Sequence, residues 1–420
     1  MTKKEIKNHK FLSTHRYAIA FFVFLIAYHV IIVNRFNTWS FVEFTYSHYC
    51  VDFSFGLGTK LLPGAIYRFL FNGHTSRLTA TVFATALVIV FFILLSMQLE
   101  KFMKRVPKKY LNSAFMLVLF FLSGSYTFCI FTKSLGLMDT YWLLIGLAFF
   151  TCLEHRYLRF LIPLLVAVSL IFHFSAIVFV IPVFCILMLY YVSISDDKKE
   201  KAALLVIFGL SIILAVIMFL ILFFYESRTI CSMPEFHEKL KENGSDFTLY
   251  YDYAFFHEWE GRAFVPESVI SMKPSLMKFF YLFYYQVKLC IDLLKTNFLN
   301  NLFALLCGIM IVFPLAGFFI RFHLSALRKK GNKLRRLCAF LMIAHFPFIF
   351  ILALLFANSV DMTRYMTYAV IPMFCFAFVI LKNEKKMGEI FFEKMLSLKN
   401  NLPLKIYALA YFLITLAPTI

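Results

Sequence analysis

Charged residues are scarce in this chain. They make up 15% of its 420 residues, against about a quarter in soluble domains, while 61% of the residues are hydrophobic. Apolar runs of about 18 residues or more, each long enough to cross a lipid bilayer, recur along the whole length. The scarcity of charge therefore excludes an ordinary soluble domain and predicts an all-α polytopic membrane protein.

Several patterns that are typical of other classes are missing. No internal repeat of fixed period is visible, although many transporters contain one. No acidic residue falls deep in an expected span, where ion-coupled transporters place theirs. No Cys-x-x-Cys pair occurs among the nine cysteines, so a zinc site of the usual spacing is not expected. These absences count against a transporter and against a structural metal site.

The net charge of +19 is distributed unevenly. When the spans are read as crossing alternately, segments on the side of the N-terminus hold 28 of the 42 Lys and Arg residues but only 9 of the 23 Asp and Glu residues. Such an excess marks the cytoplasmic face. We therefore expect a multi-pass cell-membrane protein with a cytoplasmic N-terminus. Anionic lipid headgroups account for its basic face, and nucleic acid is not an expected partner.

The number of transmembrane helices is expected to be about 11, within a range of about 10–12. Residues 161–193 lie between two charge clusters on the same expected side, so they are predicted to form two short helices broken near His173–Ser175. The other expected spans are 17–33, 79–98, 111–131, 140–153, 202–225, 302–320, 337–357, 366–381 and a short last run, 406–420.

The chain is expected to be a single membrane domain, 1–420, with elaborations outside the bilayer. Two external segments are predicted, 34–78 and 226–301. Within the second, the amphipathic and aromatic stretch 274–296 is predicted to be an interfacial helix. The basic amphipathic segment 382–405 is predicted to lie on the cytoplasmic leaflet.

Three carboxylates are expected on the external side, close to where spans meet water. Asp139 and Asp361 each precede a helical run, where a carboxylate can cap the helix or contribute to a functional site. Asp52 lies in "VDFSFGLG", where aromatic residues alternate with small ones and two glycines permit close backbone approach. A partly buried carboxylate there could serve as a general base, the alternative being an acid in a surface loop.

Four stretches of the chain carry a resemblance to known proteins. "VDFSFGLGTKLLPG", "GLMDTYWLL", "LIFHFSAIVFVIPV" and "DMTRYMTYAVIP" are similar to uncharacterised multi-span proteins of low-GC Gram-positive bacteria. The carboxylate in the first external loop, the later external aspartate, the large late external loop and the Arg-Tyr start of a late span resemble the GT-C superfamily. The resemblance covers most of residues 40–380. It implies a GT-C-like membrane glycosyltransferase that moves a sugar from a polyprenyl-phosphate-linked donor to an external cell-envelope glycan or lipid acceptor.

The resemblance also implies roles for single residues. Asp52 would be the general base that activates the acceptor hydroxyl. Arg364 would pair with the lipid phosphate, because a guanidinium matches phosphate oxygens in two parallel bonds. The spacing itself, three residues on one helix face, predicts that Asp361 orients Arg364. No DxD or ExD motif lies near Asp52. A divalent metal therefore has no support in the sequence, and no cofactor is expected.

Four further residues are candidates for substrate binding. They are Arg68 and Arg262 for phosphate, Asp139, and His173, for which a packed core histidine is the competing interpretation. Two other functions stay open on the sequence alone. One is a polysaccharide polymerase or ligase, and the other is a transporter or flippase of lipid-linked glycans. In each case the partners are the membrane, a lipid-linked sugar and a glycan or lipid acceptor.

Overall fold

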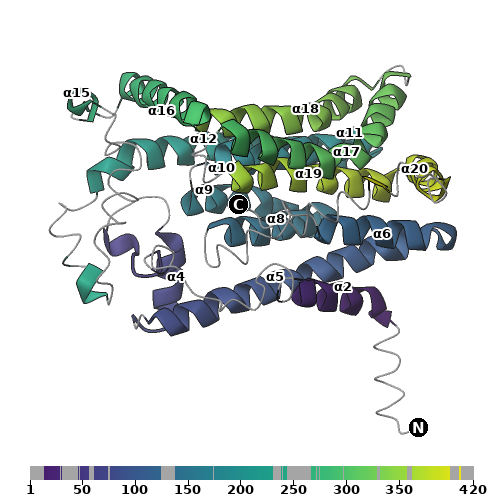
Figure 1. Ribbon diagram of the computed structural model, residues 1–420, viewed down its shortest axis with the longest axis horizontal. Coiled ribbons are helices and arrows are strands. Elements are labelled where there is room, and N and C mark those ends of the chain that lie inside the picture. Colours follow the sequence, from purple (N-terminus) through teal and green to yellow (C-terminus); the bar gives the residue numbers. More distant parts are fainter. Residues whose placement is uncertain are drawn as a thin grey trace, which may run out of the picture.

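The fold is known from a computed structural model of the chain (Figure 1). The structure describes residues 14–28, 30, 46, 48–55, 61–73, 76–123, 138–173, 175–229, 238, 240–243, 266–270, 272–273, 275–296, 298–328, 332–356, 362–397 and 406–407.

Every element in this described part is a helix, as the sequence predicted. The helices are α2 (Arg16–Ala27), η2 (Phe53–Phe55), α4 (Leu62–Leu70), α5 (Arg77–Arg105), η3 (Lys108–Tyr110), α6 (Leu111–Leu122), α8 (Met138–Glu154), η4 (Arg156–Leu161), α9 (Ile162–Phe172), α10 (Ala176–Phe179), α11 (Ile181–Ile194), α12 (Lys198–Thr229), α15 (Glu267–Ile270), α16 (Leu276–Thr296), α17 (Phe298–Arg328), α18 (Lys333–Phe356), α19 (Met362–Asn383) and α20 (Lys385–Ser397).

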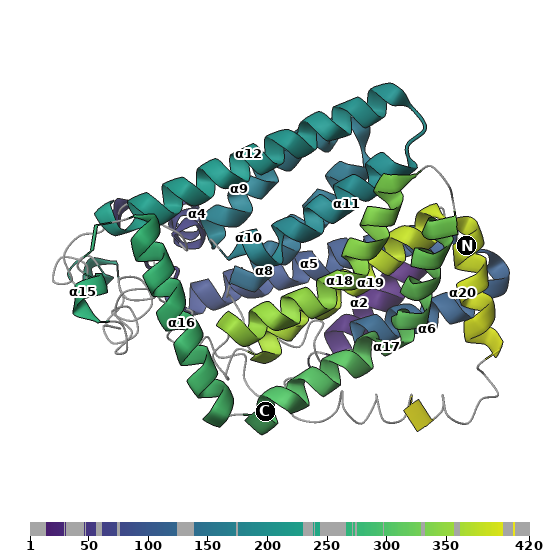
Figure 2. The same ribbon diagram turned by 90° about the horizontal axis from the view of Figure 1, so that it is seen from above.

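The long helices form an elongated bundle. Figure 1 shows α4 and α15 at one end of the bundle and α20 at the other, and Figure 2 shows α16 crossing at a steep angle to α12. We call these the Asp52 end and the α20 end. Helix α19 lies at the centre, with Met366, Val370 and Phe374 no more than 1% exposed.

Six helices in the described part are long and apolar enough to cross a membrane. They lie at 77–105, 176–194, 198–222, 305–328, 333–352 and 365–383. The chain is thus a helical membrane protein. The count of about 11 spans stays a prediction. Helices α6, α8 and α9 coincide with expected spans, but they are 12, 17 and 11 residues long, and so fall short of 18 residues.

The outward faces of these helices are apolar. On α12, Val206 and Ile213 are 61% and 57% exposed, and on α17 Phe313 is 64% exposed. Large exposed apolar surfaces are unfavourable in water but suit the hydrocarbon core of a bilayer. This surface agrees with membrane embedding of the bundle.

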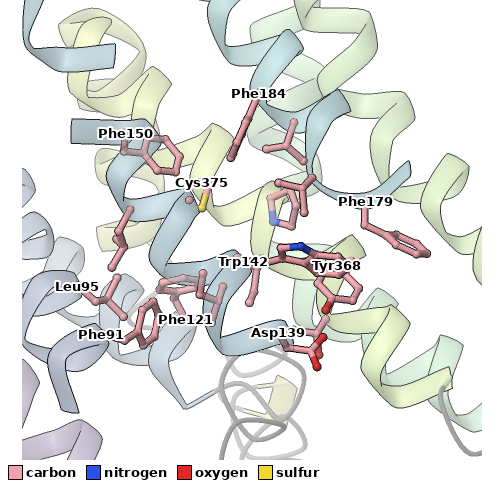
Figure 3. A pocket seen from close by; sticks show the side chains of 18 residues that line it. Phe91, Leu95, Phe121, Asp139, Trp142, Phe150, Phe179, Phe184, Tyr368 and Cys375 are labelled. Carbon is pink, nitrogen blue, oxygen red and sulfur yellow. The ribbon is translucent and has the colours of Figure 1, made fainter. Parts of the chain in front are cut away.

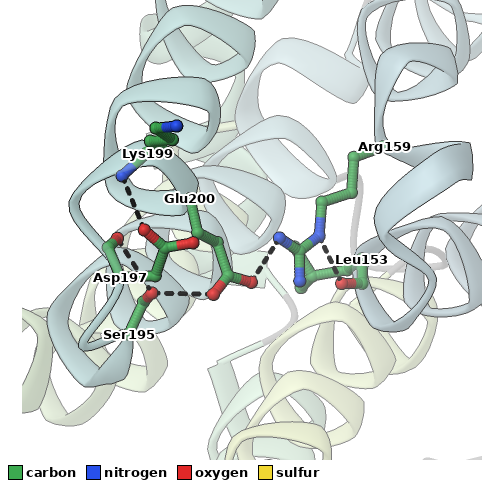
Figure 4. Close-up of polar contacts among 6 residues, drawn as sticks. All are labelled: Leu153, Arg159, Ser195, Asp197, Lys199 and Glu200. Atoms are coloured by element: carbon green, nitrogen blue, oxygen red, sulfur yellow. Dashed lines mark hydrogen bonds and ion pairs between the residues drawn. The ribbon is translucent and has the colours of Figure 1, made fainter.

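The predicted break near residues 173–175 is confirmed. Helix α9 ends at Phe172, His173 has an extended backbone (φ −167°, ψ 131°), and helix resumes at Ala176. The two flanking charge clusters meet, because Arg159 Nη1 lies 2.6 Å from Glu200 Oε1 (Figure 4). The chain therefore turns back within 161–193 and returns to the end from which it came.

Ion pairs gather at the α20 end. Besides Arg159 with Glu200, Glu154 bonds Lys382, Glu384 bonds Arg335, Glu100 bonds Lys104, and Glu393 bonds Lys109. Each carboxylate pairs with a basic residue from a segment that the sequence predicts to be cytoplasmic. This pairing keeps the excess of positive charge at that end while leaving no carboxylate of the set without a cation.

The segments predicted outside the bilayer are only partly described. Helix α16 falls within the predicted interfacial stretch 274–296 and is not one of the six candidate spans. Helix α20 falls within 382–405 and packs through Phe392 on Tyr110. Much of 226–301 and of the last run, 406–420, lies outside the described residues.

Candidate functional site

The loop that carries Asp52 is anchored by buried side chains. Tyr49, Cys50 and Val51 are fully buried. The Tyr49 ring meets the Tyr67 ring of α4 edge-on, with centroids 5.5 Å apart. Burial raises the pKa of the Tyr49 phenol well above its ordinary value, so the group stays neutral. The residues just before Asp52 are thus packed into the bundle.

Helix α4 approaches this loop through a glycine. A Cβ at Gly64 would lie 1.7 Å from the carbonyl oxygen of Val51, so only glycine permits this contact. Arg68 follows four residues later, on the same face of α4. The close approach at Gly64 therefore brings the Arg68 side chain beside Asp52.

Asp52 and Arg68 form an ion pair. Arg68 Nη1 lies 2.7 Å from Asp52 Oδ2, and the two side chains are 21% and 19% exposed. The other carboxylate oxygen, Oδ1, accepts a hydrogen bond from the Ser54 backbone N–H at 2.8 Å. The structure thus joins two residues that sequence reasoning had named for separate roles. Both charged groups remain within reach of solvent.

The start of α8 is tied to the same loop. The Tyr141 hydroxyl donates a hydrogen bond to the Tyr49 hydroxyl at 3.2 Å. On its other side the Tyr141 ring stacks on Phe172 at the end of α9, with centroids 4.5 Å apart. Asp139, two residues before Tyr141, therefore lies at the Asp52 end of the bundle.

Asp139 lines a cavity of about 110 Å³ between α5, α6, α8, α10, α11 and α19. Asp139 is buried, with only 3% of its surface exposed. Figure 3 shows its carboxylate at the edge of the cavity, with apolar and aromatic side chains around the rest of the wall. Asp139 sits in the first turn of α8, where the helix dipole favours a negative charge. The helix-capping interpretation and a role in the site are thus both consistent with its position.

Two aromatic residues that sequence reasoning missed form the adjoining wall. The Trp142 ring lies 5.4 Å from that of Tyr368, and Trp142 Nε1 donates to the Ser169 carbonyl at 3.1 Å. The Tyr368 hydroxyl is buried and has no hydrogen-bond partner within the described part of the chain. The only sequence signal was spacing: Trp142 follows Asp139 by three residues, and Tyr368 follows Arg364 by four.

His173 is held within the helix break. Its Nδ1 accepts a hydrogen bond from the Ser175 backbone N–H at 3.1 Å and lies 2.7 Å from the Ser175 hydroxyl. Its ring meets that of Trp142 edge-on at 5.8 Å. One ring nitrogen is therefore used to shape the break, next to the cavity wall, and the side chain is half-buried.

Three candidates from the sequence remain: Arg364, Asp361 and Arg262. Arg364 falls in the first turn of α19, one turn before Thr367 and Tyr368, which line the cavity. Asp361 and Arg262 lie outside the described residues. Within the ranges that are described, no group of three or more His, Cys, Asp and Glu side chains is placed to hold a metal ion.

The site therefore combines three features at one end of a membrane bundle. They are an ion pair of which about a fifth is exposed, a buried carboxylate and an apolar cavity with an aromatic wall. Comparison of the chain with protein families, with curated proteins and with solved structures finds no match.

Proposed function

We propose that the chain is a membrane glycosyltransferase that moves a sugar from a polyprenyl-phosphate-linked donor to a cell-envelope glycan or lipid acceptor. In this proposal the Asp52 end is external and the α20 end is cytoplasmic, in a GT-C-like arrangement of about 11 spans. The orientation follows from the excess of lysine and arginine expected on the cytoplasmic side.

One observation carries the proposal: charged groups and an apolar cavity lie at the same end of the bundle. A lipid-linked sugar needs both, because it joins a hydrocarbon chain to a phosphate and a sugar. The cavity beside Asp139 offers apolar contact to the part of the polyprenyl hydrocarbon chain that is nearest the phosphate. Arg68, near the same end, offers a guanidinium, which binds phosphate oxygens in paired bonds.

The reaction assigns a task to each partner of the ion pair. The acceptor hydroxyl oxygen forms a bond to the anomeric carbon, and the bond from that carbon to the phosphate oxygen breaks. The hydroxyl proton passes to the Asp52 carboxylate, and polyprenyl phosphate leaves with the electron pair. Its added negative charge is stabilised by Arg68. When Arg68 turns to the phosphate, Asp52 Oδ2 is released from the ion pair to receive the proton.

Arg364 and Asp361 retain the roles predicted from the sequence. Arg364 starts α19, whose next turn lines the cavity, so a second guanidinium near the phosphate is in keeping with the path of that helix. Arg262, Asp139 and His173 are the remaining substrate-binding candidates in the proposal. A sugar ring could contact the aromatic wall, since aromatic faces stack on the C–H faces of sugars.

The test is chemical analysis of the envelope glycans and of the lipid-linked sugars in a deletion strain. Loss of a transferase should remove one sugar from an envelope glycan and leave its unused lipid-linked donor in excess. Loss of a polymerase would leave single repeat units, and loss of a flippase would leave complete lipid-linked glycans and no exported product. Unchanged envelope glycans together with unchanged lipid-linked sugars would contradict the proposal.

A further inference from the structure

A second cavity lies next to the first, toward the α20 end. Its volume is about 100 Å³, and it is lined by four of the helices that line the first, α5, α6, α8 and α19. Five residues line both cavities: Leu95, Phe121, Leu147, Phe150 and Cys375. The two cavities are therefore neighbouring parts of one apolar groove, which runs along the helices.

The groove is about three quarters as long as the hydrocarbon core of a bilayer is thick. Its lining on α8 extends from Asp139 to Glu154, fifteen residues apart, which is a rise of about 22 Å. The hydrocarbon core of a membrane is about 30 Å thick. The groove therefore reaches through most of the depth of one bilayer, a path that suits a hydrocarbon chain lying along the membrane normal.

The α20 end of the groove carries a positive charge. Lys101 and Lys382 line it together with a single carboxylate, that of Glu154. Lys382 bonds Glu154, and this ion pair leaves the exposed Lys101 as the excess cation. Gln98 Nε2 donates to Thr151 Oγ1 at 3.0 Å and so bridges α5 and α8 one turn before Lys101. The charged opening is thus braced by a polar contact between the two helices.

We propose that this groove binds an anionic phospholipid of the leaflet at the α20 end. The phosphate lies at Lys101 and Lys382, and one acyl chain extends into the apolar part as far as Cys375, at the junction with the first cavity. Charge complementarity selects this occupant: two ammonium groups against one carboxylate favour an anionic headgroup over a zwitterionic one. The site is separate from the ion pair of Asp52 and Arg68, and the inference does not depend on the proposed function.

A structural ion pair alone would account for Lys382 and Glu154 but not for the rest of the site. An ion pair that only stabilises the fold needs no adjoining cavity and no second lysine at the opening of that cavity. The lysine stems can lie along the apolar wall while their ammonium groups stay at the headgroup level. Both elements of a phospholipid, a charged head and an apolar chain, thus have a matching surface here.

Lipid binding to the intact protein in mild detergent tests the proposal by native mass spectrometry. The probes are phosphatidylglycerol and phosphatidylcholine with identical acyl chains. Phosphatidylglycerol should bind at least about fivefold more tightly to the wild-type chain, and Lys101→Gln should lose about that factor, as expected for one lysine near an anionic headgroup. Lys108→Gln, which removes an exposed charge at the same end but not from the groove, is the matched control.

Two further variants separate head from chain binding. The double variant Glu154→Gln with Lys382→Gln removes the ion pair without leaving one charge buried, and should keep the preference for phosphatidylglycerol, because Lys101 remains and the net charge of the opening is unchanged. Cys375→Phe fills the junction of the two cavities and should weaken both lipids, with thermal unfolding used to check that the chain is folded. Equal binding of the two lipids by the wild type, or equal losses in Lys101→Gln and Lys108→Gln, would overturn the proposal. Undiminished binding by folded Cys375→Phe would do the same.

Discussion

Gly64 lies directly against the carbonyl group of Val51, so that a Cβ at position 64 would come within 1.7 Å of that oxygen. Because this oxygen belongs to the backbone of Val51, it cannot move aside as a flexible side chain would. This single contact sets the distance between α4 and the loop that carries Asp52, and with it the geometry of the ion pair to Arg68.

Gly64→Ala should therefore push α4 away from the loop. We expect a loss of stability of about 1–3 kcal/mol, as for other overpacked sites, and a larger loss of activity because the ion pair is separated. Thermal unfolding in detergent measures the first effect and product formation the second. Gly209→Ala is the control, since a Cβ at Gly209 has no atom within 4 Å. If Gly64→Ala is as stable and as active as Gly209→Ala, the contact does not position the site.

Asp52→Asn keeps the shape of the side chain and removes its basicity. If Asp52 accepts the proton of the acceptor hydroxyl, product formation should fall by about 10²–10⁴-fold while the lipid substrate still binds. Glu43→Gln is the control, nine residues earlier, and should cost much less. An inactive Glu43→Gln beside an active Asp52→Asn would show that the wrong carboxylate had been chosen.

Gly146→Leu should fill the cavity beside Asp139 without disturbing the bundle. Gly146 lines the cavity, and a Cβ there has no atom within 4 Å. Replacing a mid-helix glycine by leucine also favours the helix by up to about 1 kcal/mol. The variant should thus be at least as stable as the wild type but bind the lipid-linked substrate more weakly. Gly317→Leu, at an open glycine of α17 outside the cavity lining, should leave binding unchanged.

The docking of α20 should depend on pH at both extremes. Glu393 accepts hydrogen bonds from the Tyr110 hydroxyl and the Lys109 ammonium, and these bonds lower the pKa of Glu393. The contacts of Lys109 with Tyr110 and Glu393 raise the pKa of Lys109. Because the pKa of Glu393 is lowered, its contribution to the stability of docking is lost as the pH falls through its pKa in the folded protein. Because the pKa of Lys109 is raised, its contribution to docking is lost as the pH rises through its pKa in the folded protein.

Docking should therefore be tightest between about pH 5 and pH 10, which lie inside the ordinary pKa values of the two groups. A spin label on Lys386→Cys, at an exposed position of α20, should become more mobile outside this window. Adding Glu393→Gln should remove the acidic limb of the profile. An acidic limb that persists in that variant would assign the transition to other groups.

Single-cysteine labelling in a cysteine-free background can establish which end of the bundle is external. A membrane-impermeant thiol reagent should reach Lys241→Cys in intact cells but Lys333→Cys only after permeabilisation. Both positions are exposed, so the membrane alone should separate their reactivity. External labelling at position 333 would reverse the orientation and remove the proposed external reaction.

The main helices could be predicted from the sequence because apolar length and charge clusters are local properties of a chain. The expected spans at 140–153, 302–320 and 366–381 each fall within an observed helix, α8, α17 and α19. The break near His173 was predictable for a related reason: two charge clusters on one side require the intervening chain to turn back.

The pairing inside the site could not be predicted in the same way. Asp52 and Arg68 were both candidates, but their contact depends on the close approach of Gly64 to Val51, which only the folded chain shows. Trp142 and Tyr368 were missed because aromatic residues form 19% of this chain, so two more carry no signal of their own. Local patterns locate a helix, whereas a binding wall depends on which helices meet.

The ion pairs of the α20 end differ greatly in how far apart their partners are in sequence. Arg159 and Glu200 are 41 residues apart, so they can meet soon after their two segments leave the ribosome. Glu154 and Lys382 are 228 residues apart, and Glu154 must wait for almost the whole chain to be synthesised and inserted. During biogenesis the groove beside α8 therefore stays open on one side until α19 arrives. The insertion of that helix, late in translation, closes the bundle and completes both the cavity wall and its charged opening.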